Sequence, residues 1–120
     1  MRLRFQAKWG VIVLLISSSA ATLAASRTIV GQWQIVGEKC SPTFGAISIS
    51  PLGITGDEEA CDFDSVKRDG SIVTWKGVCF SSGDAGTRTT VVAVEDFRGR
   101  LHMTYNGIPD VNGPYVRCDR

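Results

Sequence analysis

The sequence contains one histidine, His102, and no closely spaced pair of cysteines. Nucleophilic catalysis needs a base held beside the nucleophile, and a structural zinc site needs ligands in close pairs such as C-x2-C. The four cysteines, Cys40, Cys61, Cys79 and Cys118, are 18 to 39 residues apart instead. We therefore expect a protein that is not an enzyme and that holds neither a metal ion nor a cofactor.

The chain also lacks an apolar run of about 20 residues, the length that spans a membrane. Its longest strongly apolar run, Trp9 to Ile16, follows three basic residues and precedes a stretch of serine, alanine and threonine. This is the order of regions in a secretory signal peptide. We predict a signal peptide at residues 1–26, cleaved after Ala24 or Ser26, and a periplasmic or secreted protein without a stable membrane anchor.

A basic excess is missing from the exported part. The signal peptide carries away three basic residues and no acidic ones, which leaves 10 of the 13 basic residues against 12 acidic ones. Proteins that bind nucleic acid or anionic membranes show a clear basic excess. We therefore expect no nucleic-acid partner, and a monomer that binds another protein or a small ligand.

Helical periodicity is absent too, because no exported segment shows an apolar helical stripe of ten or more residues. Alternating, β-branched segments separated by turn residues predict about seven short strands in a single domain at residues 27–120. The segments are 28–37, 46–50, 61–68, 72–80, 87–97, 100–105 and 115–118. Closing so small a sheet removes its edges, so we predict an all-β, antiparallel up-and-down barrel, with a two-sheet sandwich as the alternative.

The even number of cysteines in an exported chain predicts two disulfides. Asp69-Gly70 marks a hairpin, and a three-residue loop at 69–71 would place Cys61 directly across from Cys79. The remaining pair would then be Cys40 with Cys118. The alternative, Cys40 with Cys61 and Cys79 with Cys118, stays open at this point.

Candidate contact residues lie in the loop at 107–113, where Ile108, Pro109, Asp110 and Val111 follow an Asn-Gly turn. Loops carry binding functions more often than strands do, so this loop is the candidate contact surface. The acidic run at 57–59 is typical of a solvated face and matches no calcium-loop pattern.

Aromatic residues and the histidine have simpler interpretations. We expect Trp33, Trp75 and Tyr105 to pack in the core. His102 lies between Leu101 and Met103, so it points to solvent if those two residues face inward.

A set of glycine, aromatic, aliphatic and cysteine positions runs across the exported part: Gly31, Trp33, Cys40, Ile47, Ile49, Glu59, Cys61, Phe63, Val73, Trp75, Cys79, Leu101, Tyr115, Arg117 and Cys118. In this arrangement the sequence resembles a family of small exported alphaproteobacterial proteins with four cysteines. The resemblance implies a periplasmic location and a β fold, and it implies no activity.

A shorter stretch, Val30-Gly31-Gln32-Trp33 followed by Cys40, is similar to the opening of periplasmic metalloprotease inhibitors. That family folds as an eight-stranded lipocalin-like barrel, and its N-terminal residues enter the protease cleft. The resemblance implies that role for residues 25–28. This chain departs from the family by having four cysteines rather than two and almost no arm ahead of the first strand.

Overall fold

A computed structural model describes residues 28–118 as nine strands and one short 3-10 helix. The signal peptide expected at 1–26 lies outside these residues. Within residues 28–118, no helix is long and apolar enough to cross a membrane. The elements are β1 (Gly31–Ile35), η1 (Pro42–Phe44), β2 (Ile47–Ser50), β3 (Gly53–Thr55), β4 (Glu59–Asp69), β5 (Ile72–Ser81), β6 (Thr87–Glu95), β7 (Leu101–Tyr105), β8 (Ile108–Pro109) and β9 (Tyr115–Arg117).

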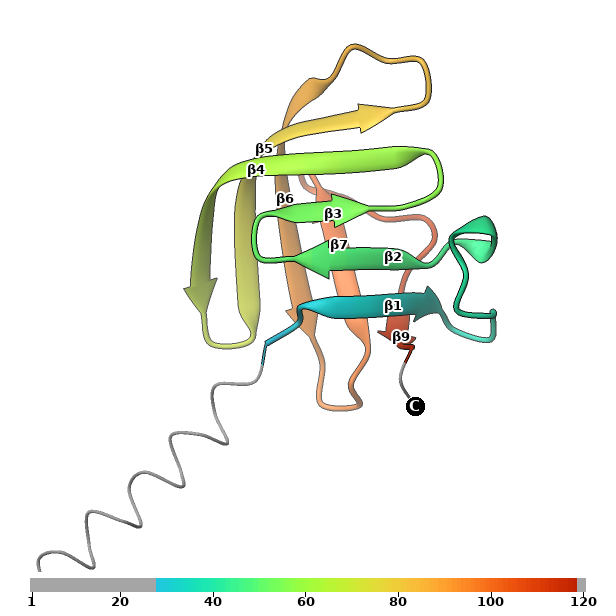
Figure 1. The fold of residues 1–120 in the computed structure, drawn as a ribbon. Coiled ribbons are helices and arrows are strands. Elements are labelled where there is room, and N and C mark those ends of the chain that lie inside the picture. Colours follow the sequence, from blue (N-terminus) through green and yellow to red (C-terminus); the bar gives the residue numbers. More distant parts are fainter. Residues whose placement is uncertain (1–27, 119–120) are drawn as a thin grey trace, which may run out of the picture.

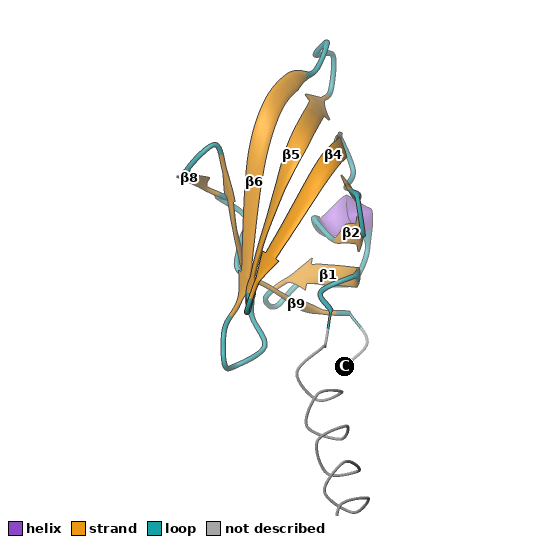
Figure 2. Ribbon diagram, turned by 90° about the vertical axis from the view of Figure 1, so that its left-hand side faces the viewer, coloured by secondary structure: helices purple, strands orange, loops and turns teal. Residues whose placement is uncertain are grey.

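Eight of the strands form a closed antiparallel barrel (Figure 1). Strands β1 to β7 each pair with the next along the chain, and β9 closes the barrel by pairing with both β7 and β1. The short strand β8 is an addition to the edge of β7. Figure 2 shows the long strands β4, β5 and β6 as one wall, with β1, β2 and β9 opposite. The predicted barrel is thus confirmed, and the sandwich alternative is wrong.

The core fills the barrel with the inward-facing residues of alternating strands. Trp33 and Trp75 are both fully buried, as predicted, and Trp75 stacks on Phe63 with 5.2 Å between the ring centroids. Leu101 and Met103 also face inward, which leaves His102 exposed as the alternation predicted.

The hairpin between β4 and β5 differs from its prediction. Asp69 pairs with Ile72, so the turn has two residues rather than the three predicted. A two-residue turn alone would shift the register by one position. A bulge between Phe63 and Ser65 takes up that shift and brings Cys61 back opposite Cys79.

Gly77 makes this bulge possible, because the backbone of β4 approaches it closely. A methyl group at Gly77 would overlap the carbonyl oxygen of Asp62 and lie 2.5 Å from the Cα of Phe63. Only glycine leaves room for so near a backbone.

Two disulfides fasten the barrel, Cys61 to Cys79 and Cys40 to Cys118. The first joins facing residues of β4 and β5, and the second ties the connection after β1 to the end of β9. This is the pairing predicted from the hairpin register, and the alternative pairing is wrong. Such bridges are typical of proteins from oxidising compartments.

One end of the barrel is closed by Trp33 and Arg117, which face each other across the β1–β9 pair. The Arg117 guanidinium lies 4.5 Å from the centre of the Trp33 ring and donates a hydrogen bond to the carbonyl oxygen of Thr28 at 2.6 Å. The Trp33 indole N–H donates to the carbonyl oxygen of Ile29 at 2.8 Å. These contacts cover the core at the end where β1 begins, which we call the Trp33 end. A pocket of about 280 Å³ lies at this end, between the β4–β5 turn and the end of β6.

Candidate ligand-binding site

Four connections meet at the opposite end of the barrel: β1–β2, β3–β4, β5–β6 and β8–β9. They surround a pocket of about 500 Å³, which we call the mouth. Its size falls in the range of pockets that hold small ligands. The lining residues are Pro42, Thr43, Gly45, Ala46, Ile47, Gly56, Asp57, Glu58, Glu59, Ser81, Ser82, Asn112 and Tyr115.

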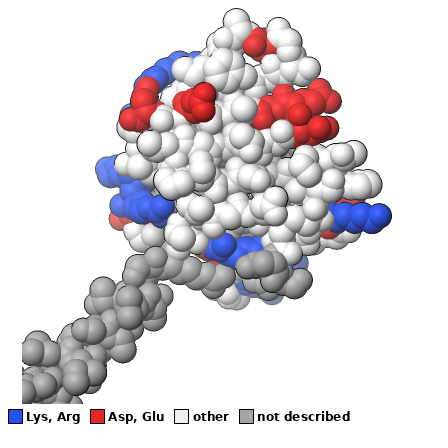
Figure 3. All heavy atoms as spheres, viewed as in Figure 1, with Lys and Arg blue, Asp and Glu red and all other residues white. Residues whose placement is uncertain are grey.

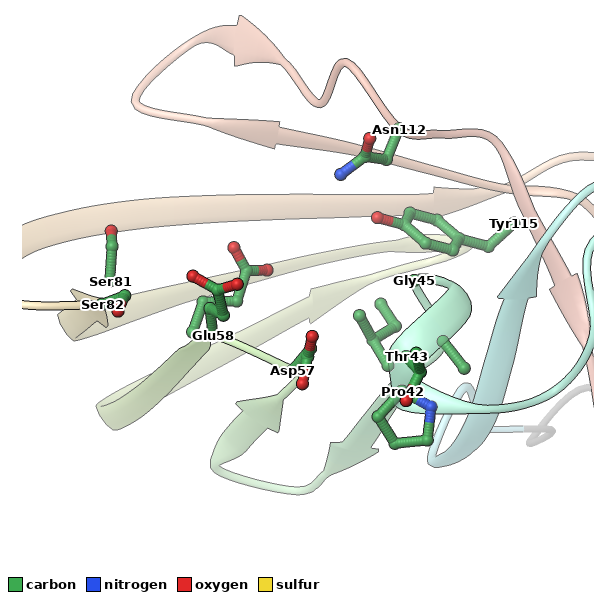
Figure 4. Close-up of a pocket in the computed structure, with 13 residues that line it drawn as sticks. Pro42, Thr43, Gly45, Asp57, Glu58, Ser81, Ser82, Asn112 and Tyr115 are labelled. Atoms are coloured by element: carbon green, nitrogen blue, oxygen red, sulfur yellow. The ribbon is translucent and has the colours of Figure 1, made fainter.

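The mouth combines an apolar floor with a polar rim (Figure 4). Ala46, Ile47 and Tyr115 are buried at its base. The rim carries the carboxylates of residues 57–59, and the hydroxyls of Ser81 and Ser82 stand beside them. This division resembles the usual composition of ligand pockets, where apolar walls support a few polar groups.

Helix η1 forms one wall of the mouth, and Gly45 fixes its position. Gly45 ends the helix with φ of 92°, a conformation that favours glycine, and its N–H donates to the carbonyl oxygen of Pro42. A side chain at Gly45 would also collide with Ile35. The chain therefore turns directly from η1 into Ala46 and Ile47, which line the floor.

Tyr115 reaches from the floor of the mouth toward the β8–β9 connection. Its hydroxyl donates to Oδ2 of Asp110 at 2.7 Å, and Oδ1 of Asp110 accepts the backbone N–H of Asn112 at 2.9 Å. Burial and this hydrogen bond raise the pKa of Tyr115 well above its usual range. The phenol therefore stays protonated and donates its hydrogen bond to Asp110.

Glu59 and Tyr105 lie close to this pair. Burial raises the pKa of Glu59, and the charge of Asp110 raises it further. Burial also raises the pKa of Tyr105, with added repulsion from Glu59 and Asp110. Within residues 28–118, the buried hydroxyl of Tyr105 has no hydrogen-bond partner.

The predicted contact loop borders this site. Asp110 holds Tyr115, and Asn112 from the same connection lines the mouth. Ile108 and Val111 are exposed, at 67% and 92%, while Pro109 belongs to β8 and pairs with Thr104. Contact by this loop with a partner stays a prediction.

Glu59 and Tyr105 lie where the sequence predicts them. The acidic run at 57–59, which includes Glu59, is exposed, and Tyr105 is partly buried and packs against the core. The sequence did not indicate that residues 57–59 line a pocket, and the only available signal was an acidic run placed just before a strand of a small barrel. The other two acids of that region, Asp62 and Asp64, lie exposed on β4, and Asp64 pairs with Arg88 at 2.6 Å.

His102 lies on β7 and contacts the β6–β7 turn at the Trp33 end of the barrel, away from the mouth. Its ring nitrogen Nε2 is 2.8 Å from Oδ2 of Asp96, in the turn before β7. This hydrogen bond is the main cause that lowers the pKa of Asp96 to about 2. Among residues 28–118, no three His, Cys, Asp or Glu side chains are grouped so that they could hold a metal ion.

Comparison with known proteins adds no identification: no protein-family model, curated protein or solved structure matches the chain.

Proposed function

We propose that the protein is an exported, non-catalytic binding protein whose small ligand occupies the mouth of the barrel. The observation that carries the proposal is the pocket of about 500 Å³, surrounded by four connections at the end opposite the Trp33–Arg117 closure. The mouth is larger than the pocket of about 280 Å³ at the Trp33 end, and small barrels commonly hold ligands in such mouths.

The reactive residues of the chain support a binding role over catalysis. All four cysteines are in disulfides, so none is a free thiol nucleophile. The single histidine, His102, pairs with Asp96 away from the mouth. The mouth therefore has no nucleophile held beside a histidine base.

Export to the periplasm or beyond the cell is part of the proposal. The signal-peptide pattern at 1–26 and the two disulfides both support it. We expect the exported chain to act as a monomer.

A thermal-shift screen tests the binding site. The oxidised protein is melted with a panel of small acids, alcohols, sugars and amines, alongside two tryptophan variants. Ser82→Trp fills the mouth, whereas Ser65→Trp adds the same side chain to an exposed position of β4 that does not line the mouth. We expect at least one compound to raise the melting temperature of the wild type and of Ser65→Trp but not of Ser82→Trp. A panel with no stabilising compound, or stabilisation that survives Ser82→Trp, would contradict the proposal.

Protease inhibition is the second candidate function. The eight-stranded barrel that opens with Gly31-x-Trp33 is the fold implied by the resemblance to periplasmic metalloprotease inhibitors. Residues 25–27 of the implied inhibitory arm lie outside the described residues. Titration against secreted zinc proteases, with and without residues 25–28, tests the idea. If the intact protein leaves every protease fully active, inhibition is ruled out as its function.

A further inference from the structure

At the Trp33 end of the barrel, the β6–β7 turn presents a phenylalanine to the solvent. Phe97 is 94% exposed, more than any other large hydrophobic residue in the described part of the chain. The guanidinium group of Arg98 lies over its ring, 5.7 Å from the ring centre. In this position the ring gains nothing from burial unless a second surface covers it.

Hydrogen bonds to Asp96 fix the turn that carries Phe97. Oδ1 of Asp96 accepts the backbone N–H groups of Arg98 and Arg100, at 2.8 Å and 3.0 Å. The backbone N–H of Asp96 donates to the carbonyl oxygen of Arg100 at 2.8 Å, and Oδ2 contacts His102. The backbone therefore cannot carry Phe97 toward the core without breaking these bonds.

Basic side chains surround this turn. Arg98 and Arg100 belong to the turn itself, and Lys67 and Arg68 come from the last residues of β4. The two groups are neighbours, because Arg68 and Asp96 line the same pocket at the Trp33 end. Figure 3 shows basic side chains over the β4–β5 hairpin, at the left of the view, and again at its lower edge.

Most of the acidic side chains at this end are already engaged. Asp96 binds the turn and His102, and Glu95 lies 3.7 Å from Arg117. Within residues 28–118, this leaves Asp69 of the β4–β5 turn against the four basic side chains around Phe97. The charge balance of the whole chain, which predicts no strongly held anionic partner, conceals this local excess.

The described part of the chain also begins at the Trp33 end. The carbonyl oxygen of Thr28 accepts a hydrogen bond from Arg117, and Ile29 lines the same pocket as Arg68. A signal peptide at residues 1–26 would therefore join the barrel here and, while attached, would hold this end beside the membrane. The mouth, at the opposite end, would face away from the membrane.

We propose that the Trp33 end docks weakly and reversibly on an anionic lipid surface, with Phe97 in the head-group layer and Lys67, Arg68, Arg98 and Arg100 on the lipid phosphates. Aromatic rings bind at membrane interfaces, and basic side chains are attracted to anionic head groups. A lipid surface fits better than a soluble anion, because it covers the apolar ring as well as the charges. This inference goes beyond ligand binding in the mouth and does not depend on it.

Co-sedimentation with lipid vesicles tests the inference on the oxidised, signal-cleaved protein. One vesicle preparation contains phosphatidylglycerol and phosphatidylethanolamine, and the other contains phosphatidylcholine alone. Phe97→Ser removes the ring, and Phe97→Trp keeps an aromatic side chain. Val111→Ser is the matched control, because Val111 is 92% exposed in the β8–β9 connection.

The charges are tested separately from the ring. Lys67→Gln combined with Arg98→Gln removes two exposed basic residues beside Phe97, and Lys39→Gln combined with Lys76→Gln removes two exposed ones elsewhere. Glycerol phosphate, measured by calorimetric titration, supplies the charge of a head group without the lipid surface.

We expect the wild type to bind the phosphatidylglycerol vesicles more tightly than phosphatidylcholine, and less tightly as salt is added. Phe97→Ser should weaken this binding by about tenfold or more, while Phe97→Trp and Val111→Ser should retain it. The Lys67→Gln, Arg98→Gln variant should also lose about tenfold or more, since each basic residue near an anionic surface contributes about fivefold. The Lys39→Gln, Lys76→Gln variant should lose much less.

A wild type that does not bind the phosphatidylglycerol vesicles would overturn the inference. Equal losses for Phe97→Ser and Val111→Ser, or for the two double variants, would show that the contact does not involve the Trp33 end. Binding of glycerol phosphate as tight as binding of vesicles would replace the membrane with a soluble anion. None of these results would affect ligand binding in the mouth, which the thermal-shift screen decides.

Discussion

At the scale of single residues, two groups near the mouth have surroundings that cost folding free energy. Burial and the charge of Asp110 raise the pKa of Glu59, which lines the mouth. The buried hydroxyl of Tyr105, in a neighbouring cavity, has no hydrogen-bond partner among residues 28–118. The cost at Glu59 is small, because its side chain is largely exposed and solvent screens its charge.

Glu59→Gln should therefore stabilise the protein slightly. The folded barrel raises the pKa of Glu59, so the folded state holds the proton more tightly than the unfolded chain does. The destabilisation caused by the ionised Glu59 is absent at acidic pH, where Glu59 is protonated in both states. It develops as pH rises above the pKa of Glu59 in the unfolded chain and is complete above its pKa in the folded barrel. At pH 7 we expect the variant to gain up to about 1 kcal/mol in the free energy of unfolding.

Urea unfolding of wild type, Glu59→Gln and the control Glu38→Gln from pH 3 to pH 7 measures this difference. The gap between Glu59→Gln and wild type should widen toward neutral pH, and Glu38→Gln should show no such trend. A Glu59→Gln variant that is less stable than wild type at pH 7 would show that Glu59 has a structural role instead.

At the scale of elements, the seven predicted segments all hold strands, and two strands were missed. The missed strands, β3 and β8, have three and two residues, and each contains or follows a turn residue that reads as a break. Such short strands exist because a neighbouring strand offers them hydrogen bonds, and local sequence does not record that. The bulge in β4 was hidden for the same reason, since it depends on contact with Gly77 in β5.

Gly77→Ala should disrupt that bulge. Its methyl group would meet the backbone of β4, which cannot move aside as a flexible side chain does. We expect a loss of about 1–3 kcal/mol or more in the free energy of unfolding, measured by guanidinium denaturation. Gly56→Ala is the control, because the nearest atom there is Cγ of Glu59, a side-chain atom at an ordinary 3.4 Å. Equal stability of the two variants would mean that β4 does not approach Gly77 so closely.

At the scale of the whole molecule, the barrel could be predicted from sequence and the mouth could not. Alternating segments, tight turns and paired cysteines all favour one small closed sheet, and the hairpin register favoured the correct disulfides. The mouth joins side chains from four connections that are far apart in the chain, from Pro42 to Tyr115. Its existence depends on barrel closure, so only the loop at 107–113 could be proposed in advance, from its composition.

Each disulfide should carry a large part of the stability of so small a barrel. The disulfide Cys40–Cys118 joins residues 78 positions apart in the sequence, and Cys61–Cys79 joins residues 18 positions apart. Replacing either pair with alanine should cost about 2–5 kcal/mol and leave the domain largely unfolded at 37 °C. Circular dichroism melts of both double variants measure this. A variant that melts together with the oxidised wild type would contradict it.

The central claim is that the open end of this barrel binds a ligand, and an NMR chemical-shift map tests it most directly. The ¹⁵N-labelled protein is titrated with the compound that raises its melting temperature most in the thermal-shift panel. We predict that the largest amide shifts fall in residues 43, 45–47, 56–59, 81–82 and 112, which line the mouth. Shifts concentrated at the Trp33 end, around the β4–β5 and β6–β7 turns, or spread evenly over the barrel would contradict the account.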